Sequence, residues 1–136
     1  MPTRICLIDD DFMVRDALTL GLRDAGYEVH PVPGAAAGFD VASRIQIDAI
    51  VTDMNMPGTN GAQFIPEARL AWPDTPIIAI SGQSIVDGRP LKEIACSLGA
   101  NTAISKPFRV RQLVETLEAL LSERRAREEP GRSRTD

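Results

Sequence analysis

Residues 4–11 read RICLIDDD, a compact apolar run that ends in three consecutive aspartates. The run has the length and the aliphatic composition of a buried β-strand. Three later segments repeat this plan, an apolar run followed at once by a polar residue: 48–52 (DAIVT) before Asp53, 76–80 (PIIAI) before Ser81, and 102–105 (TAIS) before Lys106. Four predicted strands therefore each end at a side chain that carries a charge or a hydroxyl group.

Helical patterns separate these strands. From Asp11 onward, apolar residues recur at helical spacing as far as Leu22, and Gly26 offers a C-terminal stop. A further strand, Tyr27 to Pro31, is expected to be short or at the sheet edge because of its prolines. More helices are expected over these ranges: about 35–43, 61–71, 89–98, and 110–121, where the apolar stripe is strongest. Pro66 lies inside the range 61–71, so this helix is expected to begin late.

Five strands, each followed by a helix, predict an α/β fold with one five-stranded parallel sheet covered on both faces, because parallel neighbours need crossover connections. Right-handed crossovers leave few topologies, and the flavodoxin-like (βα)5 sandwich with strand order 2-1-3-4-5 fits five such units. In sheets of this kind, ligands bind at the carboxyl ends of the strands. The polar residues that follow the strands are therefore the candidates for function.

Length and composition limit the class of protein. The 136 residues suit one domain, expected over residues 1–126, and the polar residues 127–136 are expected to form a disordered tail or linker. The formal net charge of -4 argues against direct nucleic-acid binding, and nothing after residue 127 has the length of a DNA-binding domain. No run reaches the roughly 20 apolar residues of a membrane helix, and aspartates interrupt the N-terminus before signal-peptide length. We expect a cytoplasmic protein in which Cys6 and Cys96 are buried free thiols.

The predicted strand order brings Asp9, Asp10 and Asp53 to one edge of the sheet, together with Ser81 and Lys106. Crowded carboxylates repel one another, so a cluster of this kind is most easily explained by a bound cation. Oxygen ligands without a nearby His or Cys favour Mg²⁺, Mn²⁺ or Ca²⁺ over zinc. Acids, a hydroxyl group and an ammonium group around a hard cation are typical of phosphoryl transfer.

Four segments, CLIDDD, IVTDMNMPGTNG, IIAISG and ISKPF, resemble the signature blocks of the response-regulator receiver family, in the family's order and over roughly residues 3–122. The likeness is to chemotaxis-regulator-like receivers of two-component signalling. It implies that Asp53 accepts the phosphoryl group and that Asp10 binds Mg²⁺ (Mn²⁺ is also possible) directly. The remaining roles implied are water-mediated metal binding by Asp9, a metal-binding backbone carbonyl at Asn55, phosphoryl contacts from Ser81 and Lys106, and a cis bond before Pro107.

The resemblance also implies partners. A histidine kinase or histidine phosphotransfer protein would supply the phosphoryl group, and a downstream protein would bind the face made by the fourth helix, the fifth strand and the fifth helix. A homodimer is a further possibility, and no membrane or direct nucleic-acid partner is expected. Signalling would follow from a conformational change after Ser81 turns toward the phosphoryl group.

Two positions depart from the family pattern. Ala103 stands where many members carry an aromatic residue whose rotamer reports activation, so output is expected to rely on the loop, the fourth-helix face or other side chains. The stretch from Ser81 to Lys106 is also longer than usual, and Gly88 and Pro90 predict a remodelled loop before the fourth helix.

Other functions remain open at this point. A small Mg²⁺-dependent phosphatase could use Asp53 as nucleophile, but phosphatases of the haloacid dehalogenase type need an acid where Asn55 stands. An FMN-binding flavodoxin would have to place its phosphate beside the acid cluster. A docking module that works without phosphorylation is the third alternative. Asp11 is interpreted as a helix N-cap rather than as a ligand.

Overall fold

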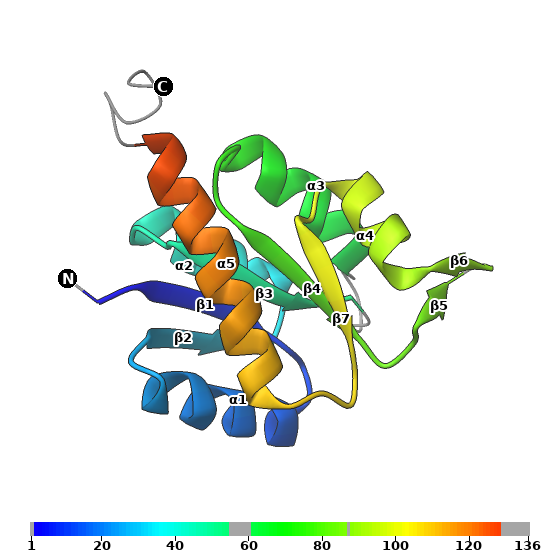
Figure 1. Cartoon of the computed structure of the whole chain (residues 1–136), viewed down its shortest axis with the longest axis horizontal. Helices are drawn as coiled ribbons and strands as arrows, with labels where there is room; N and C mark the ends of the chain where they lie inside the picture. Colours follow the sequence, from blue (N-terminus) through cyan, green and yellow to red (C-terminus); the bar gives the residue numbers. More distant parts are fainter. Residues whose placement is uncertain (1, 55–60, 87, 129–136) are drawn as a thin grey trace.

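The computed structural model describes residues 2–54, 61–86 and 88–128. Its main sheet contains five parallel strands in the order β2-β1-β3-β4-β7, which confirms the predicted order with β7 as the fifth strand (Figure 1). The strands are β1 (Arg4–Ile8), β2 (Glu28–Val32), β3 (Ala49–Asp53), β4 (Ile77–Ser81) and β7 (Thr102–Ser105). Three strands, β2, β3 and β4, differ from the predicted ranges, each by one residue toward the C-terminus.

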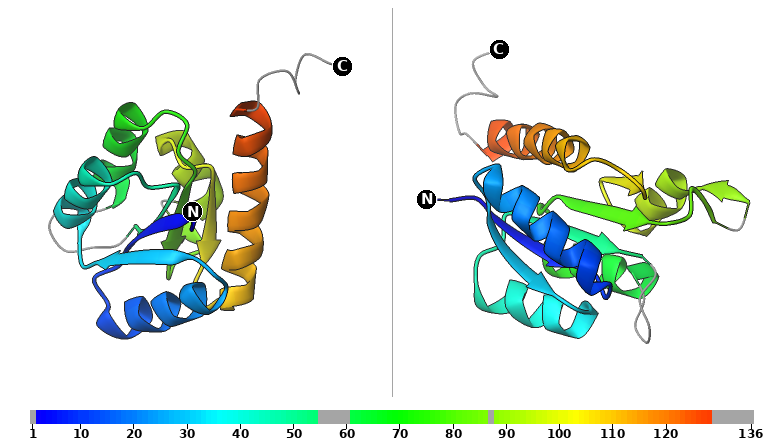
Figure 2. Two further views of the ribbon diagram at one scale, coloured as in Figure 1. Left: turned by 90° about the vertical axis from the view of Figure 1, so that its left-hand side faces the viewer. Right: turned by 90° about the horizontal axis from the view of Figure 1, so that it is seen from below.

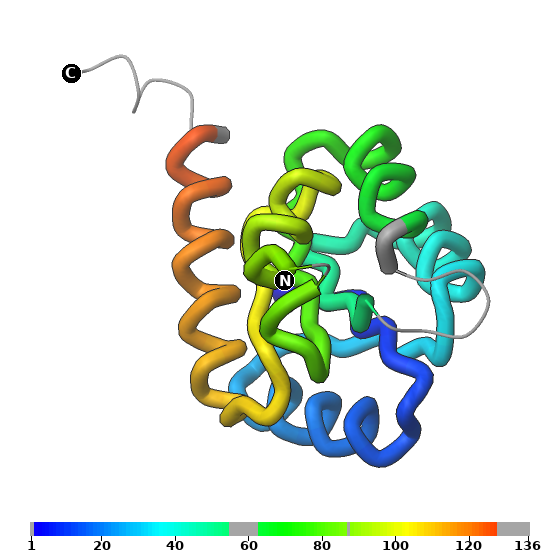
Figure 3. Tube along the Cα trace, turned by 90° about the vertical axis from the view of Figure 1, so that its right-hand side faces the viewer, coloured from blue at the N-terminus to red at the C-terminus, as the bar shows by residue number. Residues whose placement is uncertain are grey.

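Five helices cover the two faces of this sheet: α1 (Phe12–Asp24), α2 (Ala35–Arg44), α3 (Gly61–Ala71), α4 (Leu91–Leu98) and α5 (Val110–Glu128). Leu18 of α1 and Leu113 of α5 belong to one buried cluster, together with Ile5 and Leu7 of β1. The alternate residues of β1 point into a second cluster, which α2, α3 and α4 cover. Figures 2 and 3 show α5 and α3 on opposite sides of the strands. The alternation along the strands thus builds two cores, one on each face.

The loop before α4 contains a small antiparallel hairpin, β5 (Ile85–Val86) and β6 (Arg89–Pro90), which projects from the body in Figure 1. Gly88 has a φ of 77°, the left-handed conformation that glycine adopts without strain. This hairpin confirms the predicted remodelled loop. The prediction that the helix starts at residue 89 is wrong, because residues 89–90 pair in the hairpin and α4 begins at Leu91.

Two further expectations need correction. The helix α3 begins at Gly61 rather than late, so Pro66 lies inside it. Cys6 is buried, with its thiol directed to the carbonyl of Gly38, but Cys96 is exposed. Cys96 follows the buried Ala95, and one residue along a helix turns the side chain by about 100°. No helix in the described part of the chain is long and apolar enough to cross a membrane.

Candidate functional site

Strand register brings the polar ends of the strands together. Ile8 pairs with Thr52, and Asp53 pairs with Ile80, so Asp9, Asp53 and Ser81 follow one another across neighbouring strands. The backbone N–H of Lys106 donates to the carbonyl of Ser81 at 2.7 Å, which continues the row to the end of β7. The carboxyl edge of the sheet therefore collects the predicted residues, as the parallel topology requires.

The three aspartates after β1 have different environments. Asp9 is fully buried, and its Oδ1 accepts the backbone N–H of Asp11 at 2.9 Å. Asp10 is exposed. Asp11 caps α1, because its Oδ1 accepts the backbone N–H groups of Met13 and Val14 at 2.9 and 3.3 Å. The N-cap interpretation of Asp11 is confirmed.

Lys106 joins two of the carboxylates. Its Nζ lies 3.1 Å from Oδ2 of Asp9 and 3.2 Å from Oδ2 of Asp53. Asp53 is 4% exposed, whereas the Lys106 side chain keeps 23% of its surface exposed. The peptide bond from Lys106 to Pro107 is cis, as the resemblance implied. Lys106 is 97 positions from Asp9 and 53 positions from Asp53 in the sequence, yet the three side chains form one buried ionic group.

The electrostatics of this group follow from burial and crowding. Burial raises the pKa of Asp9, and the charge of Asp53 raises it further, while the N–H of Asp11 and the ammonium of Lys106 act in the opposite direction. Burial alone would lower the pKa of Lys106, but Asp53 and Asp9 together raise it above its ordinary value. Lys106 therefore stays charged, and it offsets only part of the negative charge around it.

The remaining negative charge fits a cation. Asp9, Asp10 and Asp53 each offer a carboxylate oxygen, and these oxygens lie within 4.8 Å of one another. Carboxylate oxygens, two of them from buried residues, are the donors that Mg²⁺ prefers. The residues present therefore fit the expected ion. Asn55, whose carbonyl was the fourth expected ligand, lies outside the described residues.

Ser81 ends β4 and is 1% exposed. Its Oγ accepts the backbone N–H of Gln83 at 3.1 Å. This bond forms a local turn that fixes the first residues after the strand. Farther along the same loop, the carbonyl of Ser84 accepts the N–H of Leu91, the first residue of α4, at 2.8 Å.

Sequence reasoning missed Arg15 and the apolar rim of the site. Nη1 of Arg15 donates to the carbonyl of Asp9 at 2.8 Å, and its guanidinium lies 5.6 Å from the ring centroid of Phe12. Phe12 and Met13 are largely exposed. The only signal in the sequence was position, since the first turn of a helix that follows an acidic strand end must border the site.

A sequence model of the response regulator receiver domain matches residues 5–118. The transcriptional regulatory protein PrrA of Mycobacterium leprae (strain TN) is 35% identical over 123 residues, which are 90% of this chain and 52% of PrrA. The chain thus spans about half the length of the curated relatives it matches.

Two solved structures resemble this chain closely. The chemotaxis protein CheY4 of Vibrio cholerae has a TM-score of 0.81 at 26% identity, over 88% of this chain and 99% of that chain. A CheY-like receiver domain protein of Methanospirillum hungatei JF-1 has a TM-score of 0.86 at 24% identity, over 93% and 99%, and this match concerns the fold alone.

Proposed function

Because the chain belongs to the response-regulator receiver family, whose domains accept a phosphoryl group in two-component signalling, we propose that Asp53 is the accepting residue. The observation that carries the proposal is the buried ionic group in which Lys106 contacts Asp53 at 3.2 Å and Asp9 at 3.1 Å. An ammonium group held beside a buried carboxylate can offset the charge of a phosphoryl group that arrives there. Among the described strand ends, Asp53 is the carboxylate that combines this contact with a central place in the sheet.

In the proposed reaction, a carboxylate oxygen of Asp53 attacks the phosphorus atom of a phosphohistidine. A P–O bond forms, the P–N bond to the imidazole breaks, and the leaving imidazole takes up a proton. The product is an acyl phosphate whose oxygens Lys106 and Ser81 contact. Asp9, Asp10 and Asp53, with the Asn55 carbonyl, would hold Mg²⁺ (or Mn²⁺), which supplies positive charge to the phosphoryl oxygens when bound.

Ser81 is the proposed link between the acyl phosphate and the surface. Turning its hydroxyl toward the phosphoryl group would break its bond with the N–H of Gln83. The following residues reach the hairpin and, through Ser84 and Leu91, the start of α4. Output is therefore proposed to pass through this loop, the hairpin and the face formed by α4, β7 and α5.

The proposed donor is a histidine kinase or a histidine phosphotransfer protein. The exposed side chains of Phe12 and Met13, beside the acid cluster, offer apolar surface for such a partner. PrrA is named as a transcriptional regulatory protein, but it is about twice as long as the matched region. That this chain makes no direct contact with nucleic acid, resides in the cytoplasm and can form a homodimer remain predictions.

The test is phosphorylation by a small-molecule donor. The protein, incubated with Mg²⁺ and acetyl phosphate, is expected to gain the mass of one phosphoryl group, and Asp53→Asn is expected to gain none. Asp11→Asn is the matched control, because it removes a neighbouring carboxylate that caps α1 and should leave the mass gain intact. If the unmodified protein gains no mass, or Asp53→Asn gains as much, the assignment of Asp53 is wrong.

A phosphatase reading is not favoured by the family match. The domain is a phospho-acceptor, and we propose that it catalyses only its own phosphorylation and the slow loss of the phosphoryl group. Sustained turnover of added phosphomonoesters, dependent on Asp53, would contradict this. A docking role independent of phosphorylation would require that the acid cluster fail to bind Mg²⁺.

A further inference from the structure

The turn that follows β1 is held from two sides. The carbonyl of Asp9 belongs to the peptide that precedes Asp10, and it accepts a hydrogen bond from Nη1 of Arg15 at 2.8 Å. The N–H of Asp11 belongs to the peptide that follows Asp10, and it donates to Oδ1 of Asp9 at 2.9 Å. Because a peptide unit is planar, fixing these two groups fixes both of the planes that meet at Asp10. The backbone conformation of Asp10 is therefore set by Arg15 and by the buried carboxylate of Asp9.

The side chain of Asp10 depends on that backbone. Asp10 is exposed, and its carboxylate makes no hydrogen bond or ion pair with the residues that the structure describes. One of its oxygens nevertheless lies within 4.8 Å of carboxylate oxygens of Asp9 and Asp53. Carboxylates at this separation repel one another, so an unrestrained Asp10 would turn toward solvent. The two fixed peptide planes set the direction of its Cα–Cβ bond and keep Asp10 beside the other carboxylates.

Arg15 is well placed to hold the carbonyl of Asp9. Its guanidinium lies 5.6 Å from the ring centroid of Phe12, and the aromatic face supports it. The ion pairs with Asp9 and Asp53 are made by Lys106, whereas Arg15 donates to the backbone. A guanidinium is a rigid planar donor, so its bond restrains the orientation of the acceptor. Arg15 thus acts on the shape of the turn.

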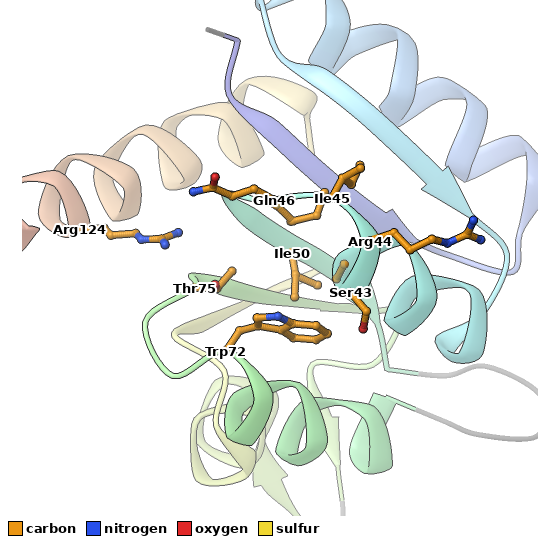
Figure 4. A pocket seen from close by; sticks show the side chains of 10 residues that line it. Ser43, Arg44, Ile45, Gln46, Ile50, Trp72, Thr75 and Arg124 are labelled. Carbon is orange, nitrogen blue, oxygen red and sulfur yellow. The ribbon is translucent and has the colours of Figure 1, made fainter.

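Other arginines make the same kind of bond at the amino ends of the strands. Arg124 extends from α5 toward the segment that leads into β3, and its Nη1 donates to the carbonyl of Asp48 at 2.9 Å (Figure 4). Nη2 of Arg23, in the last turn of α1, donates to the carbonyl of Val29 in β2 at 3.1 Å. These bonds attach helices to the sheet at the edge opposite to the acid cluster. Only the bond of Arg15, among these three, lies at the carboxyl edge and can act on the acid cluster.

We propose that Arg15 is a positioning residue for the metal site, because its bond to the carbonyl of Asp9 holds the carboxylate of Asp10 where it can bind Mg²⁺. This role rests on the proposed Mg²⁺ site. Charge and positioning predict opposite results when Arg15 is removed. A positive charge beside a cation site repels the cation, so the loss of that charge alone would tighten Mg²⁺ binding. The loss of a group that orients a metal ligand weakens Mg²⁺ binding.

The test is titration of the full chain with Mg²⁺, followed by the NMR chemical shifts of the backbone amide groups. Arg15→Met keeps most of the apolar stem and removes the donor. Its dissociation constant for Mg²⁺ is expected to rise about 10-fold, at the lower end of the effects known for groups that support metal ligands, because the bond is only partly buried. Arg23→Met is the matched control. It breaks the same kind of bond from the same helix, and it is expected to bind Mg²⁺ as the unmodified chain does.

Thermal unfolding in EDTA separates positioning from general stability. Both variants are expected to melt below the unmodified chain by similar amounts, since each loses one bond to a backbone carbonyl. Only Arg15→Met should also lose Mg²⁺ affinity. When Arg15→Met is added to Asp10→Asn, no further loss is expected, because the carboxylate that Arg15 positions is gone. Where Asp10→Asn binds Mg²⁺ too weakly to be measured, the comparison with Arg23→Met decides.

Three results would overturn the role of Arg15: unchanged or tighter Mg²⁺ binding in a folded Arg15→Met, an equal loss in Arg23→Met, or an equal loss when Asp10 is already replaced. In each of these cases the metal site itself stands. If the unmodified chain binds no Mg²⁺, the metal site is refuted and the role of Arg15 with it.

A second variant covers the case in which Arg15→Met does not fold. Phe12 is exposed and supports the guanidinium, so Phe12→Ala is expected to fold and to weaken Mg²⁺ binding about 2-fold. Leu20→Ala is its control, because Leu20 lies in the same helix and is similarly exposed. Equal Mg²⁺ affinities in these two variants would then overturn the proposal.

Discussion

Replacing Lys106 by Met should destabilise the metal-free protein by about 2–3 kcal/mol. At an effective dielectric constant of about 20, unit charges separated by 3.1 or 3.2 Å attract by roughly 5 kcal/mol, before the cost of desolvation is subtracted. Removing one partner of a buried ion pair costs about 3–5 kcal/mol, because the other charge is left uncompensated. The partial exposure of Lys106 places the expected loss below that range. Met keeps most of the apolar stem, so packing contributes little to the change.

The assay is thermal unfolding with and without Mg²⁺. In EDTA, Lys106→Met is expected to melt roughly 6–12 °C below the unmodified chain. Mg²⁺ should raise the midpoint more in the variant, because its acid cluster holds no competing ammonium group and a ligand stabilises the state that binds it. Lys92→Met is the control, since Lys92 is the chain's other lysine and is exposed. The reasoning is refuted if the two variants melt together in EDTA, or if Mg²⁺ stabilises Lys106→Met no more than Lys92→Met.

The stability deficit of Lys106→Met in EDTA should also depend on pH. The pKa of Asp9 is raised in the folded protein, chiefly by burial, so its charged form costs stability at pH values above the folded pKa. That cost disappears as the pH falls toward the ordinary aspartate pKa of 3.8. Loss of Lys106 removes an interaction that lowers the pKa of Asp9. The stability deficit of Lys106→Met should therefore be larger at pH 7.5 than at pH 5, and an equal or growing deficit at pH 5 would contradict this account.

Three other predictions concern the scaffold. Burial raises the pKa of Cys6 to about 12, so a thiol reagent at pH 8 should label only the exposed Cys96 in the folded chain, and both thiols in denaturant. Arg69→Ala should lower the free energy of unfolding by about 2–3 kcal/mol in denaturant titrations, because Arg69 donates to the carbonyl of Thr75 just before β4 and to the carbonyl of Gly99 just after α4. Gly21→Ala should cost up to about 2 kcal/mol, because a Cβ there would lie 2.7 Å from Cγ1 of Val110, and Val110→Ala, which removes both Cγ atoms, should reduce that cost.

Each of these predictions has a control within the chain. Arg111 is exposed, and its replacement by Ala should change the free energy of unfolding by less than about 0.5 kcal/mol. A Cβ at Gly34 would meet no atom within 4 Å, so Gly34→Ala should not show the cost expected at Gly21. Labelling of both cysteines in the folded chain, or equal costs for the two arginines or for the two glycines, would show that the packing has been misjudged.

The ends of the strands could be predicted from the sequence because two strong constraints agree there. Strands buried on both faces appear as uninterrupted apolar runs, and their boundaries are set by the first charged or hydroxyl residue, as at Asp9 and Ser81. Parallel topology then brings those boundaries to one edge. The contact of Lys106 with Asp9 and Asp53 follows from these two facts, although no local pattern connects the three residues.

The start of α4 and the burial of Cys96 were predicted wrongly because they depend on contacts with residues outside the short stretch of sequence used for the prediction. The strands of the hairpin are two residues long, too short for any periodicity, and Val86 of β5 is held by packing against the core under α4. Without that contact, residues 89–90 read as the start of a helix. The prediction that Cys96 is buried was wrong for a related reason. Apolar neighbours in the sequence do not show which side of an eight-residue helix faces the core.

The small side chain of Ala103 limits how the phosphorylated state can reach the surface. Ala103 is half-buried against the core on the α4 side, and it pairs with Ala79 of β4. A methyl group has no rotamers to change, so it cannot report a movement of Ser81 by swinging in or out. The described connection from Ser81 to α4 is instead a backbone connection, through the turn at Gln83 and the bond from Leu91 to Ser84. The bond from Leu91 to Ser84 closes the loop that carries the hairpin, so a displacement of Ser84 would move the base of the hairpin together with the start of α4, which makes the hairpin the natural place to look for the output of the switch.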